Sequence, residues 1–424
     1  MASSSEPVFG LGFEGTAIQY EDGKAISYAE LKELSDKAAE GIAPHTVKVL
    51  LGKNDIETMV RLVGYVNHGV VPLLLPESID GELLRKLEGA YEGVPAHEDL
   101  ALLLSTSGST GSPKLVRITA RNIASNSRIC VDAMPIAPDV RMMMVLPAIY
   151  AFGLSTAFTC LSAGATLIMS ERSVMDRELH RLMVATKATH FVGVPYMYEM
   201  LDRLRFFTNE MPDLRCLLVS GGAMAPVLRR KYAEWGRAKG VTIREGYGQT
   251  ETAGFMSFIS TDSEMEKIGS IGRVVEGCRF RIEDEELVYE GPNTAMGYAL
   301  SAADLLKPDE WCGVRHTGDL ARIDEDGYVF ITGRASRFLK VYGCRVSLED
   351  VERLVKDAFE GIDCAATGSD NHLKVFVTDA GKVQAVQQLL VAKMHFNAGA
   401  FSVKAIDALP RSAAGKVQYA QLTS

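Results

Sequence analysis

Hydrophobic and polar positions along the chain follow two recurring periods. Between Ser27 and Ile42 the apolar residues recur every three to four positions, which places Leu31 and Leu34 on one face of a predicted helix. Ser27 is suited to cap this helix, because Glu30 follows three residues later. Further helices are predicted at 56–69, 121–133, 176–187 and 225–239, and short apolar runs that predict strands lie at 47–52, 70–76, 101–105, 141–146, 165–169, 189–194 and 214–220.

This alternation of apolar strands and helices predicts the fold class α/β, with helices covering mostly parallel sheets in a large N-terminal domain. Pro72 removes a backbone donor from the run at 70–76, so we expect that strand at a sheet edge. After about residue 268 the apolar runs become shorter, charged and punctuated by glycine. That change predicts a small antiparallel β subdomain with tight turns.

The last ninety or so residues have a different pattern, which predicts a small α+β domain. Helices are expected at 347–359 and 382–396, with a strand at 373–378 between them. We therefore predict an N-terminal domain of residues 1–334 and a C-terminal domain of residues 335–424.

Composition and charge narrow the class of protein. The chain of 424 residues has 47% hydrophobic and 23% charged residues, as in ordinary globular proteins, and a formal net charge of −9, which argues against a nucleic-acid partner. Its seven cysteines are scattered singly, which indicates reduced thiols rather than disulfides or a zinc site. The sequence has neither a signal-peptide pattern nor an apolar run of about 20 residues. We expect a cytoplasmic protein without a membrane span.

The segment from Leu104 to Lys114 carries the clearest chemistry. It reads Leu-Ser-Thr-Ser-Gly-Ser-Thr-Gly-Ser-Pro-Lys between two apolar runs. Glycines let the backbone approach an anion, exposed N–H groups and hydroxyls can surround phosphate oxygens, and Lys114 adds a positive charge. A flexible Ser/Gly surface loop has the same composition, but the ordered string favours phosphate binding. The predicted phosphate-contacting residues of this loop are Thr106, Ser107, Gly108, Ser109, Thr110, Gly111 and Lys114.

Five further segments follow in a defined order. Each taken alone is compatible with an ordinary turn or a solvated side chain. They are Ser220-Gly-Gly-Ala-Met-Ala-Pro226, Glu245-Gly-Tyr-Gly-Gln-Thr-Glu251, His316-Thr-Gly-Asp-Leu320, Ile331-Thr-Gly-Arg-Ala-Ser-Arg-Phe-Leu-Lys340 and Leu409-Pro-Arg-Ser-Ala-Ala-Gly-Lys-Val417. Together with the loop, this set resembles the adenylate-forming superfamily of AMP-binding enzymes, which includes acyl-CoA synthetases, 4-coumarate-CoA ligases, luciferases and peptide-synthetase adenylation domains. The resemblance covers roughly residues 27–424.

The resemblance implies roles for residues in these segments. It implies that Tyr247 packs on adenine, that Thr250 bonds the α-phosphate and that Glu251 helps to hold Mg²⁺. Asp319 would bind the ribose diol, and Lys416 would be the catalytic lysine on a mobile loop. Further nucleotide-site positions implied in the same way are Gly221, Gly222, Ala223, Glu245, Gly246, Gly248, Ile331, Arg334 and Lys340.

The resemblance also implies that the small C-terminal domain rotates between two half-reactions. Ser336 stands where relatives have a hinge Asp or Lys, and a small residue can absorb the change in backbone angles. Lys340 matches the segment that shapes the thiol-entry face. We thus expect the 1–334 domain to be an adenylation core and the 335–424 domain to be mobile.

The acid substrate is less clear from the sequence. In the peptide-synthetase relatives, an Asp after the long crossover helix pairs with the α-ammonium group of the substrate. The corresponding stretch here, from Leu146 to Leu154, has no acidic residue, so the resemblance disfavours an amino acid. Tyr150 either contacts the substrate carboxylate or fills a pocket wall. Residues that would line an apolar pocket for an aromatic or medium-chain acid, if they are not part of the core, are Tyr150, Phe152, Tyr196, Tyr198, Gly222, Met224, Gly248 and Phe255.

The expected reaction joins a carboxylic acid to a thiol at the expense of ATP. The acid attacks ATP, pyrophosphate leaves, and the acyl group passes from acyl-AMP to CoA. One alternative is an acyl-AMP ligase that loads the phosphopantetheine of an acyl or aryl carrier protein. Another is a non-catalytic, nucleotide-binding regulatory relative, and an amide- or ester-forming ligase stays open. The sequence does not indicate the oligomeric state.

Overall fold

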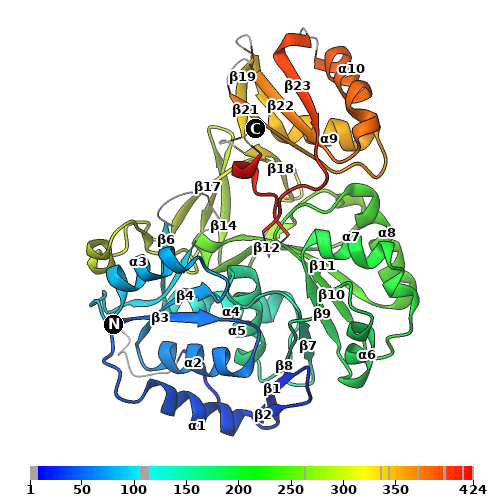
Figure 1. Cartoon of the computed structure of the whole chain (residues 1–424). Helices are drawn as coiled ribbons and strands as arrows, with labels where there is room; N and C mark the ends of the chain where they lie inside the picture. Colours follow the sequence, from blue (N-terminus) through cyan, green and yellow to red (C-terminus); the bar gives the residue numbers. More distant parts are fainter. Residues whose placement is uncertain are drawn as a thin grey trace. The chain divides into compact units, whose positions relative to one another are not determined.

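The computed structural model describes residues 8–105, 114–261, 264–334, 337–341, 344–369, 372–394, 398–412 and 415–422 (Figure 1). The chain forms two compact units. Unit 1 comprises Met1–Phe280 and Val288–Arg315, and unit 2 comprises Arg281–Leu287 and His316–Ser424. The sequence predicts a boundary at 334/335, where the domain that moves between half-reactions is expected to begin. That boundary stays a prediction. In the described part of the chain, no helix combines the length and apolar composition needed to cross a bilayer.

A five-stranded sheet supports the first half of unit 1. Its strands β3, β4 and β5 are parallel, whereas β6 and β16 join by antiparallel pairing. In spatial order the strands are β16 (Gly297–Ala299), β6 (Leu115–Thr119), β5 (Leu100–Ser105), β4 (Val71–Pro76) and β3 (Val47–Gly52). The helices of this half are α1 (Tyr28–Ala39), α2 (Ile56–Asn67) and α3 (Gly81–Tyr91).

The prediction that Pro72 marks an edge strand is wrong, because β4 lies between β3 and β5. The Val71 N–H donates to Thr46 O at 2.9 Å on the β3 side. Successive residues of a strand face opposite neighbours, so the Pro72 nitrogen faces β5. Pairing with β5 begins one residue later, at Leu73 with Leu103. An interior strand therefore accommodates the proline before its second ladder begins.

A nine-stranded sheet forms the second half of unit 1. The strands β1, β8, β7, β9, β10 and β11 are parallel, and β2, β12 and β13 pair antiparallel. In spatial order they are β13 (Arg273–Val274), β12 (Gly254–Ser260), β11 (Thr242–Gln249), β10 (Cys216–Val219), β9 (His190–Gly193), β7 (Arg141–Met144), β8 (Thr166–Met169), β1 (Thr16–Tyr20) and β2 (Ala25–Ser27). The helices are α4 (Ala120–Ala133), α5 (Ala151–Ser162), α6 (Glu178–Ala185), α7 (Pro195–Arg203) and α8 (Pro226–Lys239).

The central strands are buried almost continuously, so both faces of each sheet are covered, as in the α/β layers that the sequence predicts. One core cluster joins Leu74 of the first sheet and Met142 of the second to buried residues of α1, α2, α4 and α5. On the opposite faces, Leu73 packs with α3, and Phe191 packs with α6, α7 and α8 (Figure 1). Helix α1 begins as predicted, with a capping box between Ser27 and Glu30.

Unit 2 contains most of the shorter, charged strands. The predicted antiparallel sheet has the order β14 (Arg279–Glu283), β15 (Glu286–Glu290), β17 (Val314–Ile323) and β18 (Val329–Arg334). The division between the units passes through this sheet. The rest is an α+β arrangement whose described residues form a large core cluster and a smaller one that contains Leu409 and Leu422. It contains the hairpin β19 (Phe338–Val341) and β20 (Cys344–Ser347), the sheet of β21 (Cys364–Ser369), β22 (His372–Val377) and β23 (Phe401–Ala405), and the helices α9 (Leu348–Ala358) and α10 (Val383–Met394).

Candidate active site

The predicted phosphate loop connects the ends of two adjacent antiparallel strands. Strand β5 ends at Ser105, and it pairs with Leu115 at the start of β6. The loop residues Thr106, Ser107, Gly108, Ser109, Thr110 and Gly111 lie outside the described residues, so their predicted contacts stay predictions. Lys114, directly before β6, is exposed. The two sheet strands therefore fix both ends of the segment that is expected to hold phosphate.

The neighbouring strand β16 brings an aromatic side chain beside Lys114. Tyr298 pairs with Val116 across the β16–β6 ladder. The Lys114 Nζ atom lies 5.5 Å from the centroid of the Tyr298 ring. A cation over an aromatic face gains about 0.5–1 kcal/mol at exposed sites. The ring thus provides a preferred position for this lysine next to the loop.

Tyr298 also joins the loop side of the site to the Glu251 motif. Its hydroxyl donates to Glu251 Oε1 at 2.7 Å. Arg315 donates to the Tyr298 hydroxyl at 3.3 Å and lies 3.4 Å from the same Glu251 oxygen. The guanidinium also lies over the Trp311 ring at 4.8 Å. Burial, followed by the hydrogen bond to Glu251, raises the pKa of Tyr298 to about 12. The hydroxyl is therefore a donor to Glu251 at neutral pH.

Sequence reasoning missed Tyr298, Trp311 and Arg315. The available signal was position, because Trp311 and Arg315 stand just before the His316-Thr-Gly-Asp segment. Tyr298 had no such signal, since only the antiparallel pairing of β16 with β6 brings it to the loop.

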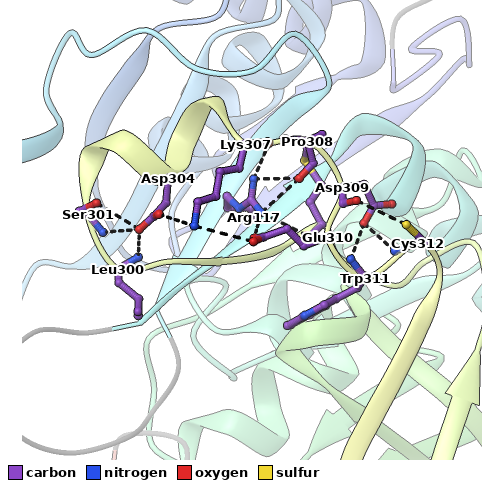
Figure 2. A network of polar contacts seen from close by, with 11 residues as sticks. Arg117, Leu300, Ser301, Asp304, Lys307, Pro308, Asp309, Glu310, Trp311 and Cys312 are labelled. Atoms are coloured by element: carbon purple, nitrogen blue, oxygen red, sulfur yellow. Dashed lines mark hydrogen bonds and ion pairs between the residues drawn. The ribbon is translucent and has the colours of Figure 1, made fainter.

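A fully buried arginine holds this part of the site in place, as Figure 2 shows. Arg117 on β6 is 0% exposed and donates to Lys307 O at 2.6 Å and to Met296 O at 3.2 Å. It also pairs with Glu310 at 2.5 Å. These contacts fasten the segment that follows β16 to the strand that follows the phosphate loop. Burial lowers the pKa of Arg117, opposed by the nearby Glu310 carboxylate.

The fastened segment is stiffened by its own polar contacts. Asp304 accepts hydrogen bonds from the backbone N–H groups of Leu300 and Ser301, both at 2.9 Å, and pairs with Lys307 at 2.8 Å (Figure 2). The Lys307 contact is the largest cause that lowers the pKa of the Asp304 carboxyl. Asp309 in turn accepts from the Trp311 N–H at 3.0 Å, so Trp311 is oriented from its own loop.

The Ser220 and Glu245 motifs meet at the carboxyl ends of neighbouring parallel strands. β10 and β11 pair in parallel, and the Ser220 hydroxyl donates to Gly246 O at 2.6 Å. Ligands of open α/β sheets bind at such strand ends. Gly221 has φ +85°, a conformation that favours glycine. A Cβ at Gly248 would lie 2.0 Å from Gly254 O, so this close turn requires glycine.

The remaining residues of these motifs lie in the turn before α8, on β11 and in the turn after β11. Gly222 and Ala223 lie in the turn before α8, and Tyr247 is half-buried on β11 opposite Ser257. Thr250 begins a 3-10 turn, η2 (Thr250–Thr252), directly after β11. The backbone carbonyl of Glu251 accepts from Ala295 N–H at 3.0 Å, which anchors that turn.

Glu245 lies in a buried ion pair. Its side chain is 10% exposed and pairs with Arg229 of α8 at 2.8 Å. Burial raises the pKa of Glu245, and the Arg229 charge opposes that shift. The carboxylate is therefore paired inside the protein in this structure, and the role of Glu245 in the nucleotide site stays a prediction.

Several predicted pocket residues belong to the core. Tyr198 is fully buried and donates to Leu218 O at 3.0 Å. Met224 is 3% exposed and Phe255 is 2% exposed. Phe152, at the start of α5, is half-buried and lies edge-on to Phe255 with ring centroids 5.5 Å apart. Tyr150, which precedes α5, is also half-buried, and burial raises its pKa. Phe152 and Tyr150 are therefore better placed to meet a substrate than Tyr198, Met224 or Phe255.

In unit 2, the structure brings two predicted nucleotide contacts together. Asp319 on β17 lies opposite Arg334 on β18, and Arg334 Nε donates to Asp319 Oδ1 at 2.9 Å. The Asp319 side chain is 3% exposed, whereas Arg334 is 56% exposed. A ribose diol would reach this carboxylate only if Arg334 moved aside. Ile331 is on the same strand, β18, partly buried. Ser336 and the side chain of Lys340 lie outside the described part of the chain.

Lys416 lies on an exposed, tightly closed turn. Its backbone N–H donates to Ser412 Oγ at 3.3 Å, and its carbonyl accepts from the Ser412 N–H at 2.8 Å. Arg411 donates to Gly415 O at 2.8 Å and pairs with Asp363 at 2.6 Å. The described residues on the two sides of this turn are therefore bonded to each other, and Arg411 attaches them to unit 2.

Comparison with known proteins gives a consistent family. The profile described as AMP-binding enzyme matches residues 76–299, more than half of the chain. The 2-succinylbenzoate–CoA ligase of Bacillus subtilis is 25% identical over 96% of this chain and 95% of that protein. The indoleacetate–CoA ligase of Aromatoleum aromaticum is 27% identical over 78% of this chain and 69% of that protein. The solved o-succinylbenzoate–CoA synthetase of Bacillus subtilis, in complex with the acyl-adenylate intermediate OSB-AMP, matches with a TM-score of 0.79 at 22% identity, covering 97% of this chain and 96% of that one. This likeness shows the α/β fold.

Proposed function

Because the chain belongs to the family of AMP-binding enzymes, we propose that it is an ATP-dependent acid–CoA ligase. The observation that carries this proposal is the cluster of Lys114, Glu251 and Arg315 around Tyr298, beside the hydroxyl-rich loop. Two cations, one carboxylate and a glycine-rich loop suit a magnesium nucleotide. The curated relatives reported above act, by their names, on aromatic acids with CoA.

In the first half-reaction the substrate carboxylate is the nucleophile. A carboxylate oxygen forms a bond to the α-phosphorus while the bond to the pyrophosphate oxygen breaks. No general base is needed, because the carboxylate is already ionised at neutral pH. Lys114 and Arg315 supply positive charge near the phosphate loop, and Lys416 adds a third cation when unit 2 takes its catalytic position. Fixed charges of this kind stabilise the charge that develops on the phosphoryl oxygens.

The residues present fit a magnesium ion carried by ATP. Mg²⁺ usually keeps one or two carboxylate ligands and completes its shell with phosphates and water. Glu251 is a hard oxygen donor, is 14% exposed and lies in the cluster beside Lys114. When bound, Mg²⁺ supplies charge neutralisation between phosphates. Tyr298 and Arg315 keep the Glu251 carboxylate oriented through the hydrogen bond and the ion pair described above.

The nucleoside would lie at the ends of β10 and β11. Tyr247 is proposed to pack on adenine, with the turn of Gly221, Gly222 and Ala223 and the backbone at Gly246 allowing close approach. Asp319 and Arg334 of unit 2 are proposed to bind the ribose and phosphate after their mutual ion pair opens.

In the second half-reaction the thiol sulfur attacks the acyl carbon, AMP leaves, and a thioester forms. We propose that residues 335–424 rotate about Ser336 between the steps, so that Lys416 leaves and Lys340 lines the thiol entrance. We also propose that the enzyme works in the cytoplasm, where ATP, CoA and reduced cysteines coexist.

An aromatic acid is the proposed substrate class. Phe152 and Tyr150 at the start of α5 offer a half-buried aromatic wall, and the stretch 146–154 has no acidic residue to bind an ammonium group. An amide or ester product would need an acceptor other than CoA or a carrier thiol.

A direct test is acid-dependent release of pyrophosphate. The panel should contain 2-succinylbenzoate, indoleacetate, anthranilate, a medium-chain fatty acid and an amino acid, with ATP and Mg²⁺. We expect release with an aromatic acid, followed by a CoA thioester detected by mass spectrometry. Supplying a phosphopantetheine carrier protein in place of CoA tests the alternative acceptor. An absence of release with every acid would overturn the proposed function.

A further inference from the structure

Arg337 directly follows the proposed hinge residue and is buried in unit 2. Its side chain is 14% exposed. Its guanidinium donates to Glu352 Oε1 on α9 at 2.8 Å and to Ala366 O on β21 at 2.9 Å. Its own backbone N–H donates to Arg334 O at 2.9 Å. The residue therefore connects the end of the hinge segment to two elements of the unit 2 core.

The same guanidinium holds the segment that follows Lys416. It lies over the Tyr419 ring with a separation of 3.9 Å, and Nη1 donates to the Tyr419 hydroxyl at 2.9 Å. The Tyr419 hydroxyl donates to Glu352 at 3.3 Å. Burial, followed by the Glu352 charge, raises the pKa of Tyr419 to about 12, so the phenol is a neutral donor at physiological pH. Tyr419 is three residues beyond Lys416.

The Lys416 turn is thus attached to unit 2 by contacts both before and after it in the sequence. Before it, Arg411 pairs with Asp363 at 2.6 Å. After it, Tyr419 is clamped between Arg337 and Glu352. Lys416 itself is exposed, and the backbone that carries it lies between these two attachments.

We propose that Arg337 and Tyr419 are positioning residues, which fix the Lys416 turn to the hinge segment so that both move as one body. This inference rests on the proposed function. If the hinge rotates while the turn lags behind, Lys416 misses the phosphoryl oxygens. A misplacement of about 1 Å can reduce a rate by as much as about 10²-fold. The clamp converts rotation at the hinge into a defined position of the lysine.

The test compares half-reactions in Tyr419→Ala. We expect adenylate formation to fall about tenfold, while transfer from preformed acyl-AMP to CoA changes less than about twofold, because only the first step uses Lys416. Tyr419→Phe keeps the ring over Arg337 and should lose less than about threefold. Arg337→Lys keeps the charge without the planar fork, and should fall between these two variants. Retained transfer shows that unit 2 is folded.

Combination with Lys416→Ala separates positioning from general damage. If Tyr419 acts through Lys416, Tyr419→Ala added to Lys416→Ala causes no further loss. A further tenfold loss, equal loss in both half-reactions, or unchanged adenylation in Tyr419→Ala would each overturn the inference. Arg353→Ala is the matched control, because Arg353 is 64% exposed and pairs with Asp350 within the same helix, α9.

A second readout does not depend on activity. Hydrogen exchange of peptides spanning residues 410–419 should accelerate in Arg337→Ala and Tyr419→Ala, and not in Arg353→Ala. Unchanged exchange would contradict the clamp. Absence of acid-dependent pyrophosphate release by the wild-type chain would instead overturn the proposed function while leaving the exchange result interpretable.

Discussion

The two units hold their proposed catalytic cations in different ways. In unit 1, Lys114 lies directly before strand β6, beside Tyr298, in a region held by the hydrogen bonds of the buried Arg117. In unit 2, Lys416 extends from an exposed turn whose attachments, Arg411 and Tyr419, lie on either side of it. Preorganised groups on rigid elements give precise geometry, whereas a group that must withdraw between steps needs a carrier that moves. The difference suggests a fixed nucleotide site and an exchangeable lysine.

The largest expected effect tests the exchangeable half. Lys416→Ala should reduce adenylate formation about 10²–10³-fold, because a charge directed at the transition state is lost. Transfer from preformed acyl-AMP should change less than about threefold. Pyrophosphate exchange and thioester formation from synthetic acyl-AMP measure the two steps separately. Equal loss in both would mean that Lys416 is not exchanged, and that the contrast between the units is false.

The next effect tests how firmly the fixed half is held. Arg117→Met keeps an unbranched apolar stem but removes the guanidinium, which leaves Lys307 O and the Glu310 carboxylate without that donor. We expect a loss of about 1–3 kcal/mol in the free energy of unfolding of unit 1, the cost of leaving a buried acceptor without its donor. Urea unfolding measures it.

The control for Arg117 is Arg121→Met on the exposed surface of α4. Its expected change is within about 0.5 kcal/mol. A similar small change in Arg117→Met would mean that the segment after β16 is held by its backbone pairing alone.

A smaller effect tests the proposed magnesium ligand. Glu251→Gln keeps an acceptor for the Tyr298 hydroxyl but removes the negative charge. Adenylate formation should fall about 10–100-fold at low Mg²⁺, as for altered metal ligation elsewhere, and should recover partly as Mg²⁺ is raised. Titration of the rate against Mg²⁺ measures this change. The exposed Glu266→Gln should leave the titration unchanged, and an unchanged titration in Glu251→Gln would remove Glu251 from the metal site.

The sequence predicted the layered fold well, because apolar periodicity is local. The capping box of α1 and the strand at 47–52 follow directly from neighbouring residues. The edge prediction for Pro72 failed because strand order depends on distant pairings. Pro72 lies in an interior strand, and the ladder between β4 and β5 begins one residue later, at Leu73.

The same distinction holds for the candidate site. Motif order suggested Lys114, Glu251 and Asp319, whereas Tyr298 and Arg117 had no motif. Their roles arise only when β16 pairs with β6, which joins residues about 180 positions apart, a separation that periodicity does not detect. Glu245 shows the converse, since a motif position was occupied by a carboxylate that the fold uses in an ion pair.

The smallest expected effect tests whether the fixed site depends on orientation as well as charge. Tyr298→Phe removes the hydroxyl that donates to Glu251 and accepts from Arg315, yet keeps the ring beside Lys114. A single hydrogen bond to a charged group contributes about 1.5–3 kcal/mol at most, and Arg315 still lies near Glu251, so we expect a three- to tenfold rise in the apparent KM for magnesium–ATP.

The pKa of Tyr298 is raised to about 12, so the folded state favours the protonated phenol. The phenol is fully protonated below the ordinary tyrosine pKa of about 10. The ratio of the apparent KM of the variant to that of the wild type should therefore stay constant between about pH 6 and pH 9, and change only as the phenol ionises in strong alkali.

Tyr20→Phe is the matched control, because its hydroxyl also donates to a carboxylate, Glu171, at 3.4 Å on an exposed surface. If Tyr298→Phe matched this control, the cluster would need only its charges, and the fixed half of the site would be less preorganised than its contacts indicate.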